Sequence, residues 1–149
     1  MNILNEDFQD FIKSLNRFNV EYMLVGGYAV ILRGYSRSTG DMDIWVNKTE
    51  ANYQQLHSAI TEFGLPAAAV MSDKFFSNEY DVFSFGKPPF AIEIMTALKG
   101  LTFMPAYEQS TIEQVNGIPV RVIHLNHLIE AKRAAGRNKD LNDLENLPG

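Results

Sequence analysis

Apolar residues recur at helical spacing in several stretches of the chain. Residues 5–19 have the period of an amphipathic helix, with Asn5 placed as its N-cap. Residues 49–63 predict a second helix, because Thr49 can cap its start and Gly64 ends it. A shorter helical stretch follows residue 27. Two further helices are predicted to close the chain, with these residues as their N-caps: Asn126 and Asn138.

Shorter apolar segments predict β-strands. The strongest turn signal is Asn116-Gly117, which joins residues 111–115 and 118–123 as a hairpin. Residues 67–80 are ambiguous, and a short helix followed by a loop is favoured. The mixed order of helices and strands predicts an α+β (α/β-like) fold. The remaining predicted strands are residues 21–25, 41–46, 81–85 and 90–95, the last two joined through residues 86–89.

Composition narrows the class of protein. With 149 residues, 46% of them hydrophobic and 21% charged, the chain fits one globular domain covering residues 1–149. The net charge of -5 excludes an overall basic surface for nucleic acid, and the lack of cysteine excludes disulfides and thiolate metal sites. The longest apolar run, residues 22–32, is too short to span a membrane, and the start lacks the pattern of a secretory signal. We therefore expect a cytoplasmic protein with no membrane association.

Three carboxylates are the first candidates for chemistry. Asp41 and Asp43 lie two apart in a predicted strand, so both side chains point to one face. Glu93 interrupts another, otherwise apolar strand. Oxygen ligands of this kind suit Mg²⁺ or Mn²⁺, and paired metals support phosphoryl chemistry. The alternative is structural: a solvent-facing Glu93 on an edge strand and an Asp41 that caps a turn.

A glycine pair strengthens the case for a phosphate site. Gly26-Gly27 joins a predicted strand to a helix, where backbone can approach an anion closely. By itself such a pair is more often a simple turn. Followed by Asp41 and Asp43 on the expected neighbouring strand, it places a phosphate cradle beside a metal site.

These residues resemble the nucleotidyltransferase superfamily, whose catalytic core is of the DNA-polymerase-β type. The matching motifs are Leu24-Val-Gly-Gly27, Asp41-Met-Asp43 and Glu93, and residues 37–43 resemble the Arg-x-Thr-x-Asp-x-Asp form of small bacterial members. The resemblance implies a minimal nucleotidyltransferase fold, a short mixed β-sheet backed by helices with a helical C-terminus. Two positions depart from the pattern: Gly27 offers no serine hydroxyl, and Glu93 stands where aspartate is common.

The C-terminal segment carries a second resemblance. Residues 137–143 fit the Arg-x-Lys-Asp-x-x-Asp motif of type IV (abortive-infection type) toxins, and Lys132 precedes Arg137 at the spacing of their Lys-x-x-x-x-Arg element. The resemblance implies that Lys139 and Asp140 contact nucleotide or assist catalysis. Lys132, Arg137 and Arg37 are candidate phosphate ligands, and Arg33, like Arg37 on the opposite side of the expected cleft, would steer a triphosphate. Asp140 and Asp143 share one face of the predicted helix, and Leu141, Leu144 and Leu147 share another as core residues. The structural alternative is a solvated, salt-bridged terminal helix, and for Asp143 function and structure stay equally open.

The combined interpretation is an Mg²⁺- or Mn²⁺-dependent enzyme that moves a nucleoside monophosphate from an NTP to an acceptor hydroxyl and releases pyrophosphate. Asp41, Asp43 and Glu93 would be catalytic and hold metal, and Gly26 and Gly27 would cradle phosphates. The acceptor stays open among tRNA or other RNA, a protein and a small molecule. The alternatives are an inactive nucleotide-binding or interaction protein of the same fold, such as a toxin with a cognate antitoxin, and a metal-dependent phosphodiesterase.

Overall fold

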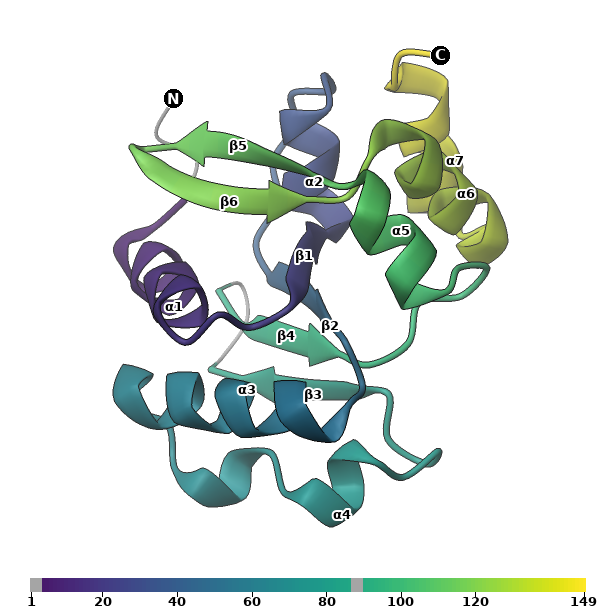
Figure 1. Cartoon of the computed structure of the whole chain (residues 1–149). Helices are drawn as coiled ribbons and strands as arrows, with labels where there is room; N and C mark the ends of the chain where they lie inside the picture. The colour runs from purple at the N-terminus through teal and green to yellow at the C-terminus, as the bar shows by residue number, and fades with distance from the viewer. Residues whose placement is uncertain (1–3, 87–89) are drawn as a thin grey trace.

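The computed structural model describes residues 4–86 and 90–149, which form a six-stranded sheet flanked by helices (Figure 1). The strand order is β3-β4-β2-β1-β6-β5. The sheet is mixed, because β1 pairs antiparallel with β2 and parallel with β6, which confirms the predicted α+β class. The strands are β1 (Tyr22–Val25), β2 (Met42–Val46), β3 (Val82–Phe85), β4 (Ile92–Met95), β5 (Thr111–Val115) and β6 (Ile118–Val122). The helices are α1 (Glu6–Arg17), α2 (Gly26–Leu32), α3 (Glu50–Phe63), the 3-10 turn η1 (Ala67–Ala69), α4 (Ser72–Phe75), α5 (Phe103–Gln109), α6 (Leu125–Ala135) and α7 (Asn138–Asn146).

The first helix follows the predicted pattern. Asn5 Oδ1 accepts a hydrogen bond of 2.8 Å from the Phe8 backbone N–H, as expected of an N-cap. The apolar face of α1 is buried, and α1 packs against α3 through an edge-to-face contact of Phe11 with Phe63 at 5.1 Å. This pair of helices covers part of the sheet away from α6 and α7 (Figure 1).

The central strands place the polar residues of interest. All four residues of β1 are buried, and the chain turns directly from Val25 into α2. A loop of residues 33–41 then leads into β2, which lies between β1 and β4. Figure 1 shows α2, α6 and α7 gathered near the end of β1, and α2 contacts α6 while α6 packs on α7. Segments distant in sequence therefore meet at one end of the sheet.

Several boundaries differ from the sequence prediction. Helix α5 has no predicted counterpart, and the ambiguous region forms η1 and α4. The cap of α6 is His124, whose Nδ1 accepts from the Asn126 N–H at 3.1 Å, so Asn126 is not the cap. The N-cap of α7 is Arg137, and Asn138 is the first helical residue. The predicted link between β3 and β4 includes residues 87–89, which lie outside the described residues.

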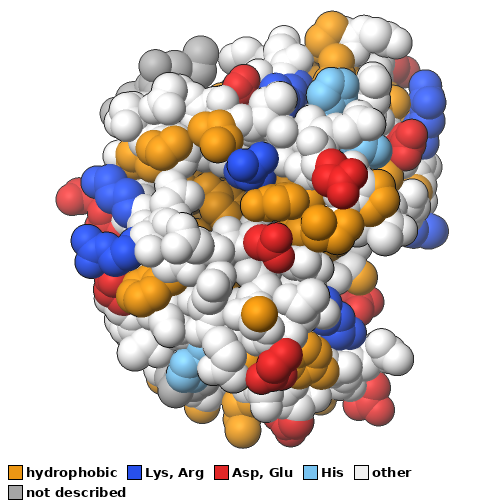
Figure 2. Space-filling view, in the orientation of Figure 1, with side chains coloured by type: hydrophobic (Ala, Val, Ile, Leu, Met, Phe, Trp, Pro, Cys, Tyr) orange, Lys and Arg blue, Asp and Glu red, His pale blue; other side chains and the backbone are white. Residues whose placement is uncertain are grey.

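The surface carries charges of both signs. On the face seen in Figure 2, acidic and basic side chains are interspersed, with apolar side chains between them. Among the residues that the structure describes, no helix combines the length and the apolar character needed to cross a membrane.

Candidate active site

Strand register brings the predicted acidic residues together. In the antiparallel pair β1–β2, Val25 is opposite Asp43, and in the parallel pair β2–β4, Asp43 is opposite Glu93. The turn after Val25, the Asp43 carboxylate and the Glu93 carboxylate therefore follow one another across three adjacent strands. The prediction that Asp43 lies on the strand next to β1 is confirmed.

The glycine turn fits closely against these side chains. Gly26 has φ +67°, and a Cβ at this position would overlap Asp43 Oδ2. A Cβ at Gly27 would overlap Thr39 Oγ1 and lie 3.4 Å from Arg37 Nη1. Both glycines thus allow neighbouring polar groups to approach the backbone at the start of α2.

The carboxylates repel one another. The pKa of Asp43 is raised to about 7, first by burial, then by a hydrogen bond shared with Glu93 and by the negative charges of Glu93 and Asp41. Asp43 Oδ1 is buried without a hydrogen-bond partner among the described residues. Asp41 is held in place differently, since its Oδ1 accepts from the Ala91 N–H at 3.1 Å. A positive charge placed beside Asp43 would relieve this repulsion.

The acidic group fits a hard divalent cation by its chemistry. Carboxylate oxygens are the ligands that Mg²⁺ and Mn²⁺ prefer, and the orphaned Asp43 Oδ1 offers one such oxygen. Within residues 4–86 and 90–149, no group of three or more His, Asp or Glu side chains is arranged so that it could hold a metal ion. Asp41, Asp43 and Glu93 are the residues that the sequence predicts to hold the ion, and in this arrangement water or substrate oxygens would have to supply much of its shell.

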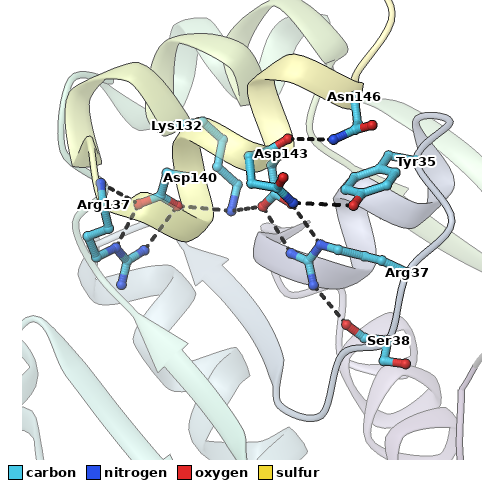
Figure 3. A network of polar contacts seen from close by, with 9 residues as sticks. Tyr35, Arg37, Ser38, Lys132, Arg137, Asp140, Asp143 and Asn146 are labelled. Carbon is cyan, nitrogen blue, oxygen red and sulfur yellow. Dashed lines mark hydrogen bonds and ion pairs between the residues drawn. The ribbon is translucent and has the colours of Figure 1, made fainter.

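A second group of polar side chains forms a chain of alternating charges (Figure 3). Lys132 Nζ lies 3.2 Å from Asp140 Oδ1 and 3.1 Å from Asp143 Oδ2. Arg137 Nε donates to Asp140 Oδ2 at 2.7 Å, and its backbone N–H donates to the same oxygen at 3.1 Å. Arg37 forms a bidentate pair with Asp143, at 2.7 Å from Nε and 3.0 Å from Nη2. This network, which we call the charge chain, ties α6, α7 and the loop of residues 33–41 together.

Acid is expected to weaken the charge chain. Burial by itself would raise the pKa of Asp140 and of Asp143, but the bonds and charges of Lys132, Arg137 and Arg37 outweigh it and lower both. A carboxylate with a lowered folded-state pKa contributes stability that is complete above its unfolded pKa of about 3.9 and is lost as the pH falls through the folded-state value. The free energy of unfolding should therefore fall steeply below about pH 4.

Urea unfolding from about pH 6 down to about pH 2.5 measures this dependence. The variant Asp143→Asn should show a shallower acid dependence than the wild type. Glu145→Gln, which removes an exposed carboxylate from the same helix, should keep the full dependence. A wild-type stability that stays constant down to about pH 3 would contradict the assignment.

The carboxylates Asp41, Asp43 and Glu93 and most residues of the charge chain line one cavity of about 550 Å³. Of the eleven candidate residues from the sequence, all except Arg33 and Asp140 line it: Gly26, Gly27, Arg37, Asp41, Asp43, Glu93, Lys132, Arg137 and Lys139. Asp140 is completely buried behind the wall and lines an adjoining slot of about 100 Å³. That slot is lined largely by apolar side chains, including Met95, Leu98 and Leu128. A cavity of this size accommodates a ligand of nucleotide size.

The structure gives the basic residues different surroundings. Lys139 is exposed on the cavity wall, whereas Lys132 is buried between two carboxylates. Arg33 lies away from the cavity, and its Nε donates to the Ile123 carbonyl at 2.9 Å, so its suggested role in steering a triphosphate is wrong.

The interpretation of the apolar face of α7 is also wrong in part. Leu141 is 48% exposed, Leu144 is half-buried and only Leu147 reaches the core. The inward face of α7 instead presents Asp140 and Asp143 to the charge chain.

Three cavity residues carry no functional assignment from the sequence: Thr39, Gly40 and Asn142. Thr39 belongs to the quoted Arg-x-Thr-x-Asp-x-Asp pattern, which is the signal that marks it. Asp143, for which the sequence left function and structure equally open, lines the cavity through the carboxylate that holds Arg37.

The overall fold is similar to that of several solved structures. TM1012 from Thermotoga maritima, which carries a provisional nucleotidyltransferase assignment, aligns with a TM-score of 0.64 and 16% identity over 93% of this chain and 88% of its own. The lincosamide antibiotic adenylyltransferase LnuA, solved with lincomycin, aligns with a TM-score of 0.57 and 14% identity over 98% and 97%.

A third solved structure, ANT(2")-Ia in complex with adenylyl-2"-tobramycin, aligns with a TM-score of 0.58 and 16% identity over 93% of this chain and 83% of its own. No protein-family model matches the sequence, and a search of curated proteins finds no match. At these identities the likeness establishes the fold, and the activity has to be argued from the site itself.

Proposed function

We propose that this protein is a metal-dependent nucleotidyltransferase that moves a nucleoside monophosphate from an NTP to an acceptor hydroxyl. The observation that carries the proposal is the row formed by the Gly26-Gly27 turn, Asp43 and Glu93 along one cavity. The structural neighbours with this fold support the reaction class.

The residues divide the work by their chemistry. The Gly26-Gly27 turn admits the triphosphate close to the backbone, and Lys139 and Arg37 offset its negative charge from the cavity wall. Asp41, Asp43 and Glu93 would hold Mg²⁺, which when bound neutralises phosphate charge and activates oxygen nucleophiles. Glu93 would also orient an acceptor hydroxyl and take its proton.

The bonds exchanged define the products. The acceptor oxygen forms a bond to the α-phosphorus while the bond from that phosphorus to the bridging oxygen of pyrophosphate breaks. The hydroxyl proton passes to a carboxylate, and pyrophosphate takes the electron pair of the broken bond. The protein contributes mainly positioning and charge neutralisation, as in other phosphoryl transfers.

For the acceptor, we propose a small hydroxyl-bearing molecule. The structures of LnuA and ANT(2")-Ia contain lincomycin and adenylyl-tobramycin, respectively, which supports testing this class first. The net charge of -5 fits a small acceptor better than an extended RNA surface.

The proposal is tested by the thermal stability of the wild-type protein with each NTP, with and without Mg²⁺. A ligand present at a hundred times its Kd stabilises the folded state by about 2.7 kcal/mol, and each kcal/mol moves Tm by roughly 2–4 °C at this chain length. We expect a rise of several degrees that requires both NTP and metal.

Transfer from labelled NTP to a panel of small hydroxylated molecules then identifies the acceptor, with release of pyrophosphate as the second readout. The absence of any Tm change with NTP and Mg²⁺ would overturn the enzyme proposal and favour an interaction protein on this fold. Label released as free NMP, with no enlarged acceptor, would favour a phosphodiesterase.

A further inference from the structure

The loop of residues 33–41 folds back over the start of α2. It places Thr39 so close to Gly27 that a Cβ on this glycine would overlap Thr39 Oγ1 and lie 2.9 Å from Thr39 Cβ. The same Cβ would lie 3.4 Å from Arg37 Nη1. The hydroxyl of Thr39, twelve residues further along the chain, therefore occupies the space that a side chain at residue 27 would take.

Thr39 is one of the residues that line the cavity, and its Oγ1 lies against Gly27. Thr39 lines the cavity together with Arg37, Gly27 and Asp43. Among the hydrogen bonds of residues 4–86 and 90–149, none involves Thr39 Oγ1, so its O–H is available to a ligand. Arg37 Nη1 donates to the Ser38 carbonyl at 2.9 Å, while the Asp143 pair fixes the rest of its guanidinium.

The chemistry of this corner favours an anion. The Thr39 hydroxyl and the Arg37 guanidinium lie together beside Gly27, which has no side chain to block a ligand. A phosphate oxygen accepts hydrogen bonds from hydroxyl and guanidinium groups and benefits from the positive charge. A neutral acceptor would gain only hydrogen bonds from the guanidinium, whereas a phosphate also gains from its charge, so these residues suit the triphosphate better than the acceptor.

We propose that the Thr39 hydroxyl donates a hydrogen bond to a non-bridging phosphate oxygen of the bound NTP, beside Gly27. This inference rests on the proposed nucleotidyltransferase function. It also gives a physical reason for Gly27: the hydroxyl that a side chain at residue 27 would supply comes from Thr39 instead.

The test compares Thr39→Val, which keeps the shape and removes the hydroxyl, with Thr39→Ser, which keeps the hydroxyl. Calorimetry in the presence of Mg²⁺ measures the Kd of three ligands. They are the NTP that gives the largest Tm rise, the matching NMP and inorganic triphosphate. In Thr39→Val, the NTP and inorganic triphosphate should bind about ten-fold more weakly, and the NMP as before. In Thr39→Ser, all three should bind within about three-fold of the wild type.

A relocated hydroxyl provides the second variant. Gly27→Ser alone should disturb the site through the overlap with Thr39, whereas Gly27→Ser combined with Thr39→Ala should recover most of the NTP affinity lost in Thr39→Ala. This comparison carries the test if Thr39→Val is too unstable to measure.

Three results would overturn the proposal. One is wild-type affinity for NTP in Thr39→Val, and another is an equal loss in Thr39→Val and Thr39→Ser, which would show that only packing matters. The third is an equal loss of NTP and NMP binding. In each of these three results the wild-type protein still binds NTP, so the proposed function stands. If the wild-type protein binds no NTP, both the proposed function and the role of Thr39 are overturned.

Discussion

Replacing Lys132 by methionine is expected to destabilise the protein by about 3 kcal/mol, because removing one partner of a buried ion pair costs ~3–5 kcal/mol. The Lys132 side chain is 9% exposed and lies between carboxylates that are 0% and 2% exposed. Without the ammonium group, the carboxylates of Asp140 and Asp143 would lose the positive charge that lies between them. Each keeps one arginine partner, which is why we expect the lower end of the range.

Thermal and urea unfolding measure this loss, and a Tm decrease of roughly 6–12 °C corresponds to it at this chain length. Lys139→Met is the matched control: it removes an exposed lysine from the same cavity and should cost less than about 0.5 kcal/mol. In the variant Lys132→Met with Asp140→Asn and Asp143→Asn, the like charges are gone and part of the stability should return. Equal stability of Lys132→Met and the wild type would contradict the role of the charge chain.

The part of the site built from local signals could be predicted from the sequence. A strand that ends in two glycines leaves few ways to continue other than a turn into the next helix, and alternation fixes the common face of Asp41 and Asp43. The register of β1, β2 and β4 then brings the glycine turn, Asp43 and Glu93 together as expected. Here hydrophobic burial and strand pairing point to the same arrangement.

The role of α7 could not be predicted in the same way. Leu141, Leu144 and Leu147 predict a buried face. Asp140 and Asp143 turn inward instead, because Lys132 on α6 and Arg37 in a distant loop offer them charged partners. The Arg37–Asp143 pair joins residues 106 positions apart, and no local pattern encodes it. The energy of several charge-assisted bonds outweighs the burial of one leucine here, which leaves Leu141 exposed.

The cap of α6 and the place of Thr39 have the same kind of cause. Asparagine is the commoner cap, yet His124 takes this position because its ring nitrogen reaches the Asn126 N–H. Thr39 lies in a loop, and its contact with Gly27 depends on how the 33–41 loop returns over α2. Sequence spacing does not specify such contacts, since a loop of this length has many conformations.

Replacing Asp43 by asparagine is expected to abolish nucleotidyl transfer while leaving the fold intact. Asp43 is the central carboxylate of the row, and its Oδ1 is buried without a partner among the described residues. The amide keeps the shape but loses the charge and one acceptor oxygen, so the variant should neither hold the cation nor position the triphosphate. Loss of several kcal/mol of transition-state stabilisation lowers kcat on the order of a thousand-fold or more.

Stability is the measurement that separates this loss from unfolding. Burial and the neighbouring charges of Glu93 and Asp41 disfavour a charged Asp43, so a neutral side chain of equal size should leave Tm in the absence of ligand unchanged or higher. The Tm rise with NTP and Mg²⁺ should disappear, and transfer of labelled nucleotide should stop. Asp81→Asn, which neutralises an exposed aspartate outside the cavity, should retain both the Tm rise and the transfer.

If Asp43→Asn kept wild-type transfer, the reaction could not depend on this carboxylate, and the metal assignment would fail with it. If it kept the NTP-induced rise but lost transfer, nucleotide binding would rest on the glycine turn and the basic wall, and Asp43 would serve the chemical step alone.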